Sequence, residues 1–328
     1  MSKQKPKGSI VYFCIILLLV LVMIFSGLQI LESTIFNVGQ ESDGSFVSKT
    51  IVRNGVEYFP RQDITVVMVL GVDQKGPVSE SGSYNNRGMA DVITLLIFDE
   101  TNHNCRVLQL NRDTMTDVRV LGLGGRYAGT MYGQLALAHS YGSGLADSCE
   151  NTRETVSDML YGLRIDYYMA LNMDAISIMT DAVGGVKVNV KDDFSLVDPS
   201  IGMGEVILNG QQAINYVQVR KDVADQMNVS RMERHREFMS GLMTGLLAKM
   251  QTDPTTAVSI FDQTSAYMVT DCSGTVISNF ADRYGGYPLV EIVSPEGELK
   301  QGTQYMEFYV DEAKLDELIL RLFYAPKK

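Results

Sequence analysis

The chain has 328 residues, of which 45% are hydrophobic and 20% charged, with a net charge of −11 at pH 7. This length is enough for one large domain or two small ones. The acidic balance argues against nucleic acid as a partner, because affinity for nucleic acid comes mostly from neutralising phosphates. It also makes each cluster of arginines informative, since positive charge in this chain is local.

Residues 8–31 carry no charged side chain and consist mainly of large apolar residues, enough to cross a bilayer. Lys3, Lys5 and Lys7 precede this stretch, which predicts a cytoplasmic tip over residues 1–9 and an extracellular C-terminal part. A cleaved signal peptide is the alternative. We favour an uncleaved, single-pass signal-anchor in the cell membrane over residues 10–31, because the stretch is longer than a usual signal core and no Ala-x-Ala site follows it.

Residues 32–60 are polar and show no sustained periodicity, which predicts a linker or stalk. Residues 61–328 then form the expected extracytoplasmic domain. Removing the three N-terminal lysines leaves 25 basic against 39 acidic side chains, so the exported part has a net charge near −14.

From residue 63 onward strands and helices alternate. Short apolar runs and apolar residues at helical spacing are the signals. Strands are predicted at residues 65–70, 92–98, 107–110, 165–171, 186–190 and 289–293. Helices are predicted at residues 173–183, 209–216, 232–250 and 311–323. The glycines of residues 121–126 lack the following helix and the acidic partner of a dinucleotide site, so we expect a hairpin loop there.

Charged residues stand at the ends of the first three predicted strands. Asp73 follows the first run, Asp91 opens the second, and Arg112 with Asp113 follows the third. Open α/β folds build their sites at such strand ends. Two carboxylates suit a hard divalent cation and arginine suits a phosphate, so the pattern indicates phosphate chemistry. The alternative is that the aspartates only cap turns and that Arg112 forms a weak surface pair with Asp113.

A second basic group contains Arg220 with Lys221, and then Arg231 with Arg234. Arg231 and Arg234 are three residues apart, so they share one face of a helix. If that helix begins near Ser230, they occupy its first turn, where the helix dipole favours anions over cations. Positive charge at that end is explained if an anion binds there. A solvated basic face is the alternative.

Other site chemistries find little support in the sequence. Cys105, Cys149 and Cys272 have no metal-type spacing, and a Cys105–Cys149 disulfide or buried thiols remain open. The three histidines are scattered, which argues against zinc. No Gly-x-Ser-x-Gly, Walker-type or His-Glu-x-x-His motif is present.

Taken in order, these blocks resemble the LytR-CpsA-Psr family of cell-envelope proteins. The resemblance extends from residue 63 to the C-terminus and includes the preceding anchor. It rests on the order and spacing of the following pieces: Gly71-Val72-Asp73, Ala90-Asp91-Val92-Ile93, Asn111-Arg112-Asp113-Thr114, Ala138-His139-Ser140-Tyr141-Gly142, Ile165-Asp166-Tyr167-Tyr168, Asp181-Ala182-Val183-Gly184-Gly185-Val186, Leu208-Asn209-Gly210-Gln211-Gln212-Ala213, Arg220 and Arg231-Met232-Glu233-Arg234.

The resemblance implies a phosphotransferase that moves a glycopolymer, such as a wall teichoic acid or a capsular polysaccharide, from a polyprenyl-pyrophosphate carrier to peptidoglycan. It implies Mg²⁺ on Asp73 and Asp91, and an apolar pocket for the lipid tail. The pyrophosphate would be bound by arginines, namely Arg112, Arg220 and Arg231, and we add Arg234 and Lys221 as candidates. The candidate catalytic residues are Arg112, Asp113 and Asp91, with Asp113 as a possible acceptor of the sugar hydroxyl proton.

Three positions depart from the family pattern. Gln218 stands where the family usually has the first arginine of Arg-x-Arg, His235 where it usually has glutamine, and Asn228 near a usual acidic residue. Our leading hypothesis is a Mg²⁺-dependent glycopolymer transferase with an α/β fold, in which helices cover both faces of a mixed central sheet (αβα layers). The alternatives are a non-catalytic protein that binds or senses polyprenyl phosphates, which the loss of charge at Gln218 favours, and a pyrophosphatase acting on the same carrier.

Overall fold

A six-stranded sheet forms the centre of the computed structural model, which describes residues 50–83, 88–219, 223, 228–253 and 255–327. The expected anchor at residues 10–31 and the expected linker up to residue 49 lie outside the described residues. Within the described part of the chain, no helix is both long enough and apolar enough to span a membrane.

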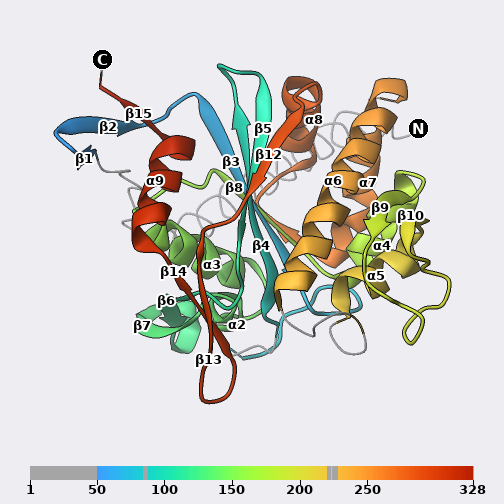
Figure 1. Cartoon of the computed structure of the whole chain (residues 1–328), viewed down its shortest axis with the longest axis horizontal. Helices are drawn as coiled ribbons and strands as arrows, with labels where there is room; N and C mark the ends of the chain where they lie inside the picture. Colours follow the sequence, from blue (N-terminus) through green and yellow to red (C-terminus); the bar gives the residue numbers. More distant parts are fainter. Residues whose placement is uncertain (1–49, 84–87, 220–222, 224–227, 254, 328) are drawn as a thin grey trace, which may run out of the picture. The chain divides into compact units, whose positions relative to one another are not determined.

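The central sheet is mixed, as predicted (Figure 1). Its parallel pairs are β3–β8 and β5–β12, and its antiparallel pairs are β3–β4, β4–β5 and β8–β11. The order across the sheet is β11 (Met268–Thr270), β8 (Tyr167–Leu171), β3 (Ile64–Val72), β4 (Ala90–Asp99), β5 (Asn104–Leu110) and β12 (Leu289–Val293). Strands β3, β4 and β5 are rich in Val, Ile and Leu, which suits a sheet buried on both faces.

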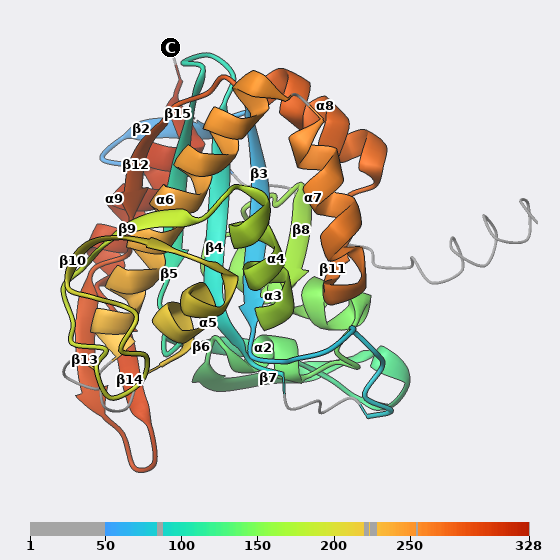
Figure 2. The same cartoon turned by 90° about the vertical axis from the view of Figure 1, so that its right-hand side faces the viewer.

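Helices cover both faces of this sheet (Figures 1 and 2). On one face, α3 (Ala146–Met159) and α9 (Glu312–Phe323) pack on β3 and β4 through apolar side chains such as Val156 and Ile319. On the other face, α4 (Met173–Ala182) and α7 (Thr256–Thr264) pack on β3 and β8 through Ala175 and Phe261. The αβα layers expected from the sequence are therefore present.

Further helices and strands extend the second layer. The long helix α6 (Asn228–Thr252) contacts β12 and also β9 (Val186–Val190), which pairs with β10 (Gly204–Leu208). Helix α5 (Gly210–Gln218) packs between α4 and α6, and α8 (Gly274–Tyr284) stacks Tyr284 on Phe98 of β4. The predicted helices and strands are all present, with bounds that differ by a few residues.

Two hairpins lie beside the end of β5. The first joins β6 (Met115–Leu121) to β7 (Tyr127–Gln134) through a short 3₁₀ turn at Leu123–Gly125, which confirms the loop predicted at residues 121–126. It is followed by a short helix, α2 (Leu137–Ser140). The second hairpin, β13 (Gly297–Gln301) with β14 (Met306–Val310), was not predicted as a pair of strands.

The last part of the expected linker is ordered as strands, which corrects the predicted boundary at residue 60. Strands β1 (Ile51–Arg53) and β2 (Val56–Pro60) form a hairpin, and β2 also pairs with β15 (Tyr324–Pro326) next to the C-terminus. Ile51 and Tyr58 pack against the main core. These strands are only three to five residues long, and a short hairpin is stable only when it packs on other structure. Residues 51–60 therefore show no clear strand pattern in the sequence.

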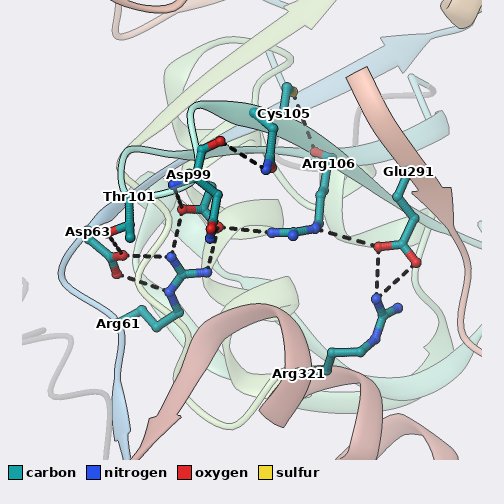
Figure 3. A network of polar contacts seen from close by, with 10 residues as sticks. Arg61, Asp63, Asp99, Thr101, Cys105, Arg106, Glu291 and Arg321 are labelled. Carbon is teal, nitrogen blue, oxygen red and sulfur yellow. Dashed lines mark hydrogen bonds and ion pairs between the residues drawn. The ribbon is translucent and has the colours of Figure 1, made fainter. Parts of the chain in front are cut away.

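A network of ion pairs and hydrogen bonds connects several strands at the end of the sheet where β3 begins and β4 ends (Figure 3). Arg61 donates from Nη1 to Oδ2 of Asp99 over 2.9 Å, and Arg106 donates to the same oxygen over 3.0 Å. Glu291 of β12 lies 3.7 Å from Nε of Arg106 and accepts two hydrogen bonds from Arg321 of α9. The network thus joins β4, β5, β12 and α9 at the sheet end that lies away from Asp91.

Candidate functional site

Asp73, Asp91 and Arg112 lie at one end of the central sheet. Strands β3 and β5 both run antiparallel to β4, so the residues that follow β3 and β5 lie beside the start of β4. Asp73 follows the last residue of β3, Asp91 is the second residue of β4, and Arg112 comes two residues after β5. The structure therefore brings these three sequence candidates together.

A bulge in β4 sets the position of Asp91. Gly71 of β3 is paired with Val92, and the next residue is paired with Ala90, so that Asp91 has no residue opposite it. A Cβ atom added to Gly71 would lie 2.9 Å from Cβ of Val92, closer than such atoms approach in proteins. Glycine is therefore required for this register, and the bulge redirects the Asp91 side chain.

Two guanidinium groups converge on the carboxylate of Asp91. Arg112 donates from Nη1 to Oδ1, and Arg231 of α6 donates from Nη1 to Oδ2 over 2.9 Å. Both arginines are buried, with 7% and 2% of their surface exposed. Both guanidinium groups are largely removed from water, and the low local dielectric strengthens the attraction of each for a nearby anion.

Asp113 is held beside Arg112 by contacts from two hairpins. Its Oδ1 lies 3.4 Å from Nε of Arg112 and accepts a hydrogen bond from Nε2 of Gln134 at 3.1 Å. Gln134 also donates to the carbonyl oxygen of Met306, and the N–H of Phe308 donates to the carbonyl oxygen of Asp113. Strands β7 and β14 therefore fix the orientation of this carboxylate. Gln134 was not identified from the sequence, where nothing links it to residue 113.

The residues at the start of β4, from Gly88 to Ala90, are held by contacts from the segment around α2. Burial lowers the pKa of His139, which favours a neutral ring, and its Nδ1 donates to the carbonyl oxygen of Gly88 at 2.7 Å. Ala136 accepts from the N–H of Ala90 and donates to the carbonyl oxygen of Arg112. The segment around α2 thus holds the start of β4 against the residues that follow β5.

Asp73 is exposed and has a different partner from Asp91. Nε2 of Gln218, the last residue of α5, donates to Oδ1 of Asp73 over 2.9 Å. The helix is fixed at its other end by a capping box between Asn209 and Gln212. The departure from the family pattern at residue 218 therefore lies in direct contact with a candidate metal ligand.

The donor set at this sheet end fits Mg²⁺. Within the described residues, no three His, Cys, Asp or Glu side chains cluster as metal ligands. Mg²⁺ is nevertheless usually held by one or two carboxylates together with water and substrate phosphates. Asp73, directly after β3, and Asp91, in β4, offer such carboxylate oxygens, and in this structure both oxygens of Asp91 accept hydrogen bonds from arginines.

Arg234 and His235 hold the end of α5. Arg234 donates to the carbonyl oxygens of Tyr216 at 2.9 Å and Val219 at 2.6 Å. Nε2 of His235 lies 2.9 Å from the carbonyl oxygen of Val217, which makes it the donor. The structure therefore does not bring Arg234 together with Arg231 at the carboxylate, although the two share a helix.

Three sequence candidates remain, namely Arg220, Lys221 and Asn228. Arg220 and Lys221 lie outside the described residues. Asn228 begins α6, but the placement of its side chain is not described.

The three described cysteines are buried and free, so the Cys105–Cys149 disulfide that the sequence left open is not formed in this structure. Burial raises the pKa of Cys105 to about 12, which makes it an unreactive thiol.

A cavity of about 500 Å³ lies between α6 and β12. Its lining includes Met243 and Leu247 from the helix, and Leu289 and Ile292 from the strand. The first lining residue on α6, Ser240, comes nine residues after Arg231, which is roughly 13 Å along a helix. Arg236, between them, donates to Oγ of Ser294 just after β12. Helix α6 thus contributes both Arg231 and part of the lining of the cavity.

The whole described domain also matches a known protein family. Residues 34–322 match the sequence profile of the LytR_cpsA_psr family. The chain belongs to the LytR-CpsA-Psr family. The resemblance inferred from the short motifs is thereby confirmed.

Individual members of the LytR-CpsA-Psr family are distant from this chain. The polyisoprenyl-teichoic acid–peptidoglycan teichoic acid transferase TagU of Enterococcus faecalis is 24% identical over 321 residues, 97% of this chain and 94% of that protein. TagU of Bacillus subtilis is 27% identical over 56% of this chain, and the match spans about half of that relative's length, 52%. A solved structure of TagT bound to LI-WTA has a TM-score of 0.60 at 21% identity, covering 85% of this chain and 96% of TagT. This last likeness shows a shared fold.

Proposed function

We propose that this protein is a phosphotransferase that attaches a teichoic acid, carried on a polyisoprenyl diphosphate, to peptidoglycan. The names of the related TagU proteins support both the donor and the acceptor in this proposal. They favour a teichoic acid over a capsular polysaccharide as the glycopolymer.

The observation that carries the proposal is the convergence of Arg112 and Arg231 on one carboxylate. Two guanidinium groups that bind both oxygens of Asp91 are spaced to bind an anion with several oxygens. Arginine presents a planar set of donors that matches phosphate oxygens. A diphosphate at this point places its charge beside two buried cations. Arg220 and Lys221 complete the proposed binding set from outside the described residues.

In the proposed reaction, an oxygen of an acceptor sugar hydroxyl attacks the phosphorus that bears the glycopolymer. A new phosphorus–oxygen bond forms, the bond to the bridging oxygen of the diphosphate breaks, and the lipid leaves as a monophosphate. Arg112 and Arg231 stabilise the negative charge that develops on the leaving phosphate. Asp113, oriented by Gln134, is the group placed to accept the proton of the hydroxyl.

Mg²⁺ is part of the proposal, with Asp73 and Asp91 as the residues that would hold it. When bound, the ion supplies neutralisation of phosphate charge. To hold the ion, Asp91 would have to give up contacts with Arg112 and Arg231, and these arginines would then be available to the diphosphate.

The cavity between α6 and β12 is our candidate for the lipid chain. Its lining combines Met, Leu, Val and Ile side chains with the polar Ser240, Thr244, Gln251 and Glu291, and it begins a few helical turns from Arg231 on α6. A polyisoprenyl chain in this cavity would leave its diphosphate near the start of the helix. We further propose that residues 10–31 anchor the protein in the cell membrane with the domain outside, since donor lipid and peptidoglycan meet there.

The test is a transfer assay with the full-length chain in detergent, a lipid-linked teichoic acid precursor, a peptidoglycan acceptor and Mg²⁺. The expected product is a phosphodiester-linked conjugate, together with lipid monophosphate. Arg112→Ala, Arg231→Ala and Arg220→Ala should each lower conjugate formation by about 100-fold or more while the far-UV spectrum stays unchanged.

The same assay discriminates between the transferase and its alternatives. Lipid monophosphate and unlinked polymer in the presence of acceptor would indicate a pyrophosphatase. Donor binding without either product would indicate a binding protein. Either result contradicts the proposed transfer.

A further inference from the structure

The two carboxylates at the sheet end are held in electrically different ways. Asp91 accepts hydrogen bonds from two guanidinium groups, which carry formal charge. Asp73 accepts one from Nε2 of Gln218, a neutral amide, at 2.9 Å. A hydrogen bond from an amide orients a carboxylate without cancelling its charge. Among the described residues, Asp73 thus has a neutral hydrogen-bond donor where Asp91 has two charged ones.

The backbone around Gln218 is fixed by buried groups on α6. Arg234 binds the carbonyl oxygens of Tyr216 and Val219, and His235 binds that of Val217. The residues on both sides of Gln218 are thus held in place, so the amide is aimed at Asp73 by a rigid support.

We propose that Gln218 is a positioning residue that orients Asp73 as the principal carboxylate for a divalent cation. The inference deepens the proposed function, because it rests on Asp73 being a cation ligand. It also explains why glutamine stands at residue 218. A glutamine in place of arginine removes one positive charge from the site, and this raises the affinity for the cation that accompanies the diphosphate.

The electrostatic argument sets the expected size of the effect. An arginine at residue 218 would place a unit positive charge a few ångströms from the cation, and even with strong solvent screening that repulsion weakens binding by about tenfold or more. Loss of the hydrogen bond alone, without added charge, weakens binding by about fivefold, the usual net value of one such bond.

The experiment measures Mn²⁺ binding to the full-length chain in detergent, without donor or acceptor, from the electron paramagnetic resonance signal of free Mn²⁺. Mn²⁺ prefers the same oxygen ligands as Mg²⁺. We expect Gln218→Arg to bind about tenfold more weakly than wild type, Gln218→Leu about fivefold more weakly, and Asp73→Asn more weakly than either.

Gln211→Arg is the matched control. Gln211 is exposed on the same helix, seven residues and about 10 Å earlier, and its amide bonds to Asn215. This variant adds the same charge to α5 away from Asp73, so we expect its Mn²⁺ affinity to equal that of wild type. Thermal unfolding of each variant separates loss of fold from loss of binding.

The outcomes distinguish this inference from the proposed function. Wild-type affinity for Mn²⁺ in Gln218→Arg, or equal losses in Gln218→Arg and Gln211→Arg, would overturn the role of Gln218 and leave the transferase proposal standing. If the wild-type chain binds no Mn²⁺ even with inorganic pyrophosphate added, both the role of Gln218 and the Mg²⁺ site of the proposed function are contradicted. A failed transfer assay alongside the expected order of Mn²⁺ affinities would overturn only the transfer reaction.

Discussion

Arg231 donates from Nη1 to Oδ2 of Asp91 over 2.9 Å, although 140 residues separate them in the chain. This contact joins the start of α6 to the start of β4, so helix and sheet together form the proposed anion site. Neither residue is extensively exposed, and each therefore depends on the other for compensation of its charge.

Replacement of Arg231 by alanine should lower the transfer rate by about 10²- to 10³-fold, the usual loss for one group that stabilises developing charge. Arg231→Lys should restore only part of the rate, because lysine lacks the planar fork of donors that arginine presents to phosphate oxygens. The measurement is the rate of conjugate formation at saturating donor. Arg236→Ala, on the same helix but bonded to Ser294, is the control and should stay within a fewfold of wild type.

Gly71→Ala should impair the site through the backbone alone. The added Cβ would collide with Val92, so the register of β3 and β4 must shift and carry Asp91 with it. We expect a loss of stability of about 1–3 kcal/mol, in the range for overpacking, together with weaker binding of pyrophosphate. Denaturant unfolding and calorimetric titration measure the two effects. Gly202→Ala, where a Cβ meets no atom within 4 Å, should change neither.

Arg234→Met should destabilise the domain rather than act on the anion directly. It removes hydrogen bonds to the carbonyl oxygens of Tyr216 and Val219 and leaves Asp192 without its 3.4 Å ion pair. Loss of a buried, charged donor of this kind costs about 3 kcal/mol. Equilibrium unfolding in urea tests this. Arg283→Met, an exposed arginine paired with Glu100, should cost less than about 1 kcal/mol, and equal losses in the two variants would contradict the structural role of Arg234.

The charge network of Figure 3 should make the domain sensitive to acid. Hydrogen bonds from Arg61 lower the pKa of Asp63 to about 2. Burial alone would raise the pKa of Asp99, but hydrogen bonds from Arg61 and Asn102 lower it well below its usual range. A carboxylate whose pKa is lower in the folded state contributes stability above its unfolded value, near pH 4. That contribution should disappear progressively as the pH falls from about 4 toward 2.

Asp99→Asn isolates the buried member of the network. The Asp99 side chain is fully buried, so its loss leaves Arg61 and Arg106 poorly compensated, at a cost of about 3 kcal/mol at neutral pH. The difference in unfolding free energy between wild type and Asp99→Asn should shrink as the pH falls below about 4. A difference that stays constant from pH 7 to pH 2 would argue against the network as the source of acid sensitivity.

Local pattern was enough to predict most of the elements and part of the site. The apolar runs before Asp73 and Arg112 are buried strands because few other structures can bury such runs, and Asn209 caps its helix through contacts that span only three residues. The charged residues at strand ends follow from the same runs, since a strand that ends at a sheet edge leaves its next residue at that edge.

Tertiary structure decided what those residues contact. Arg231 and Arg234 are equivalent by helical spacing, yet one binds Asp91 and the other binds the carbonyl oxygens at the end of α5. The roles of Gln134 and Gln218 likewise depend on contacts between distant segments. Sequence periodicity specifies the face on which a side chain lies, whereas its partner is set by the packing of whole helices and strands, which no local pattern encodes.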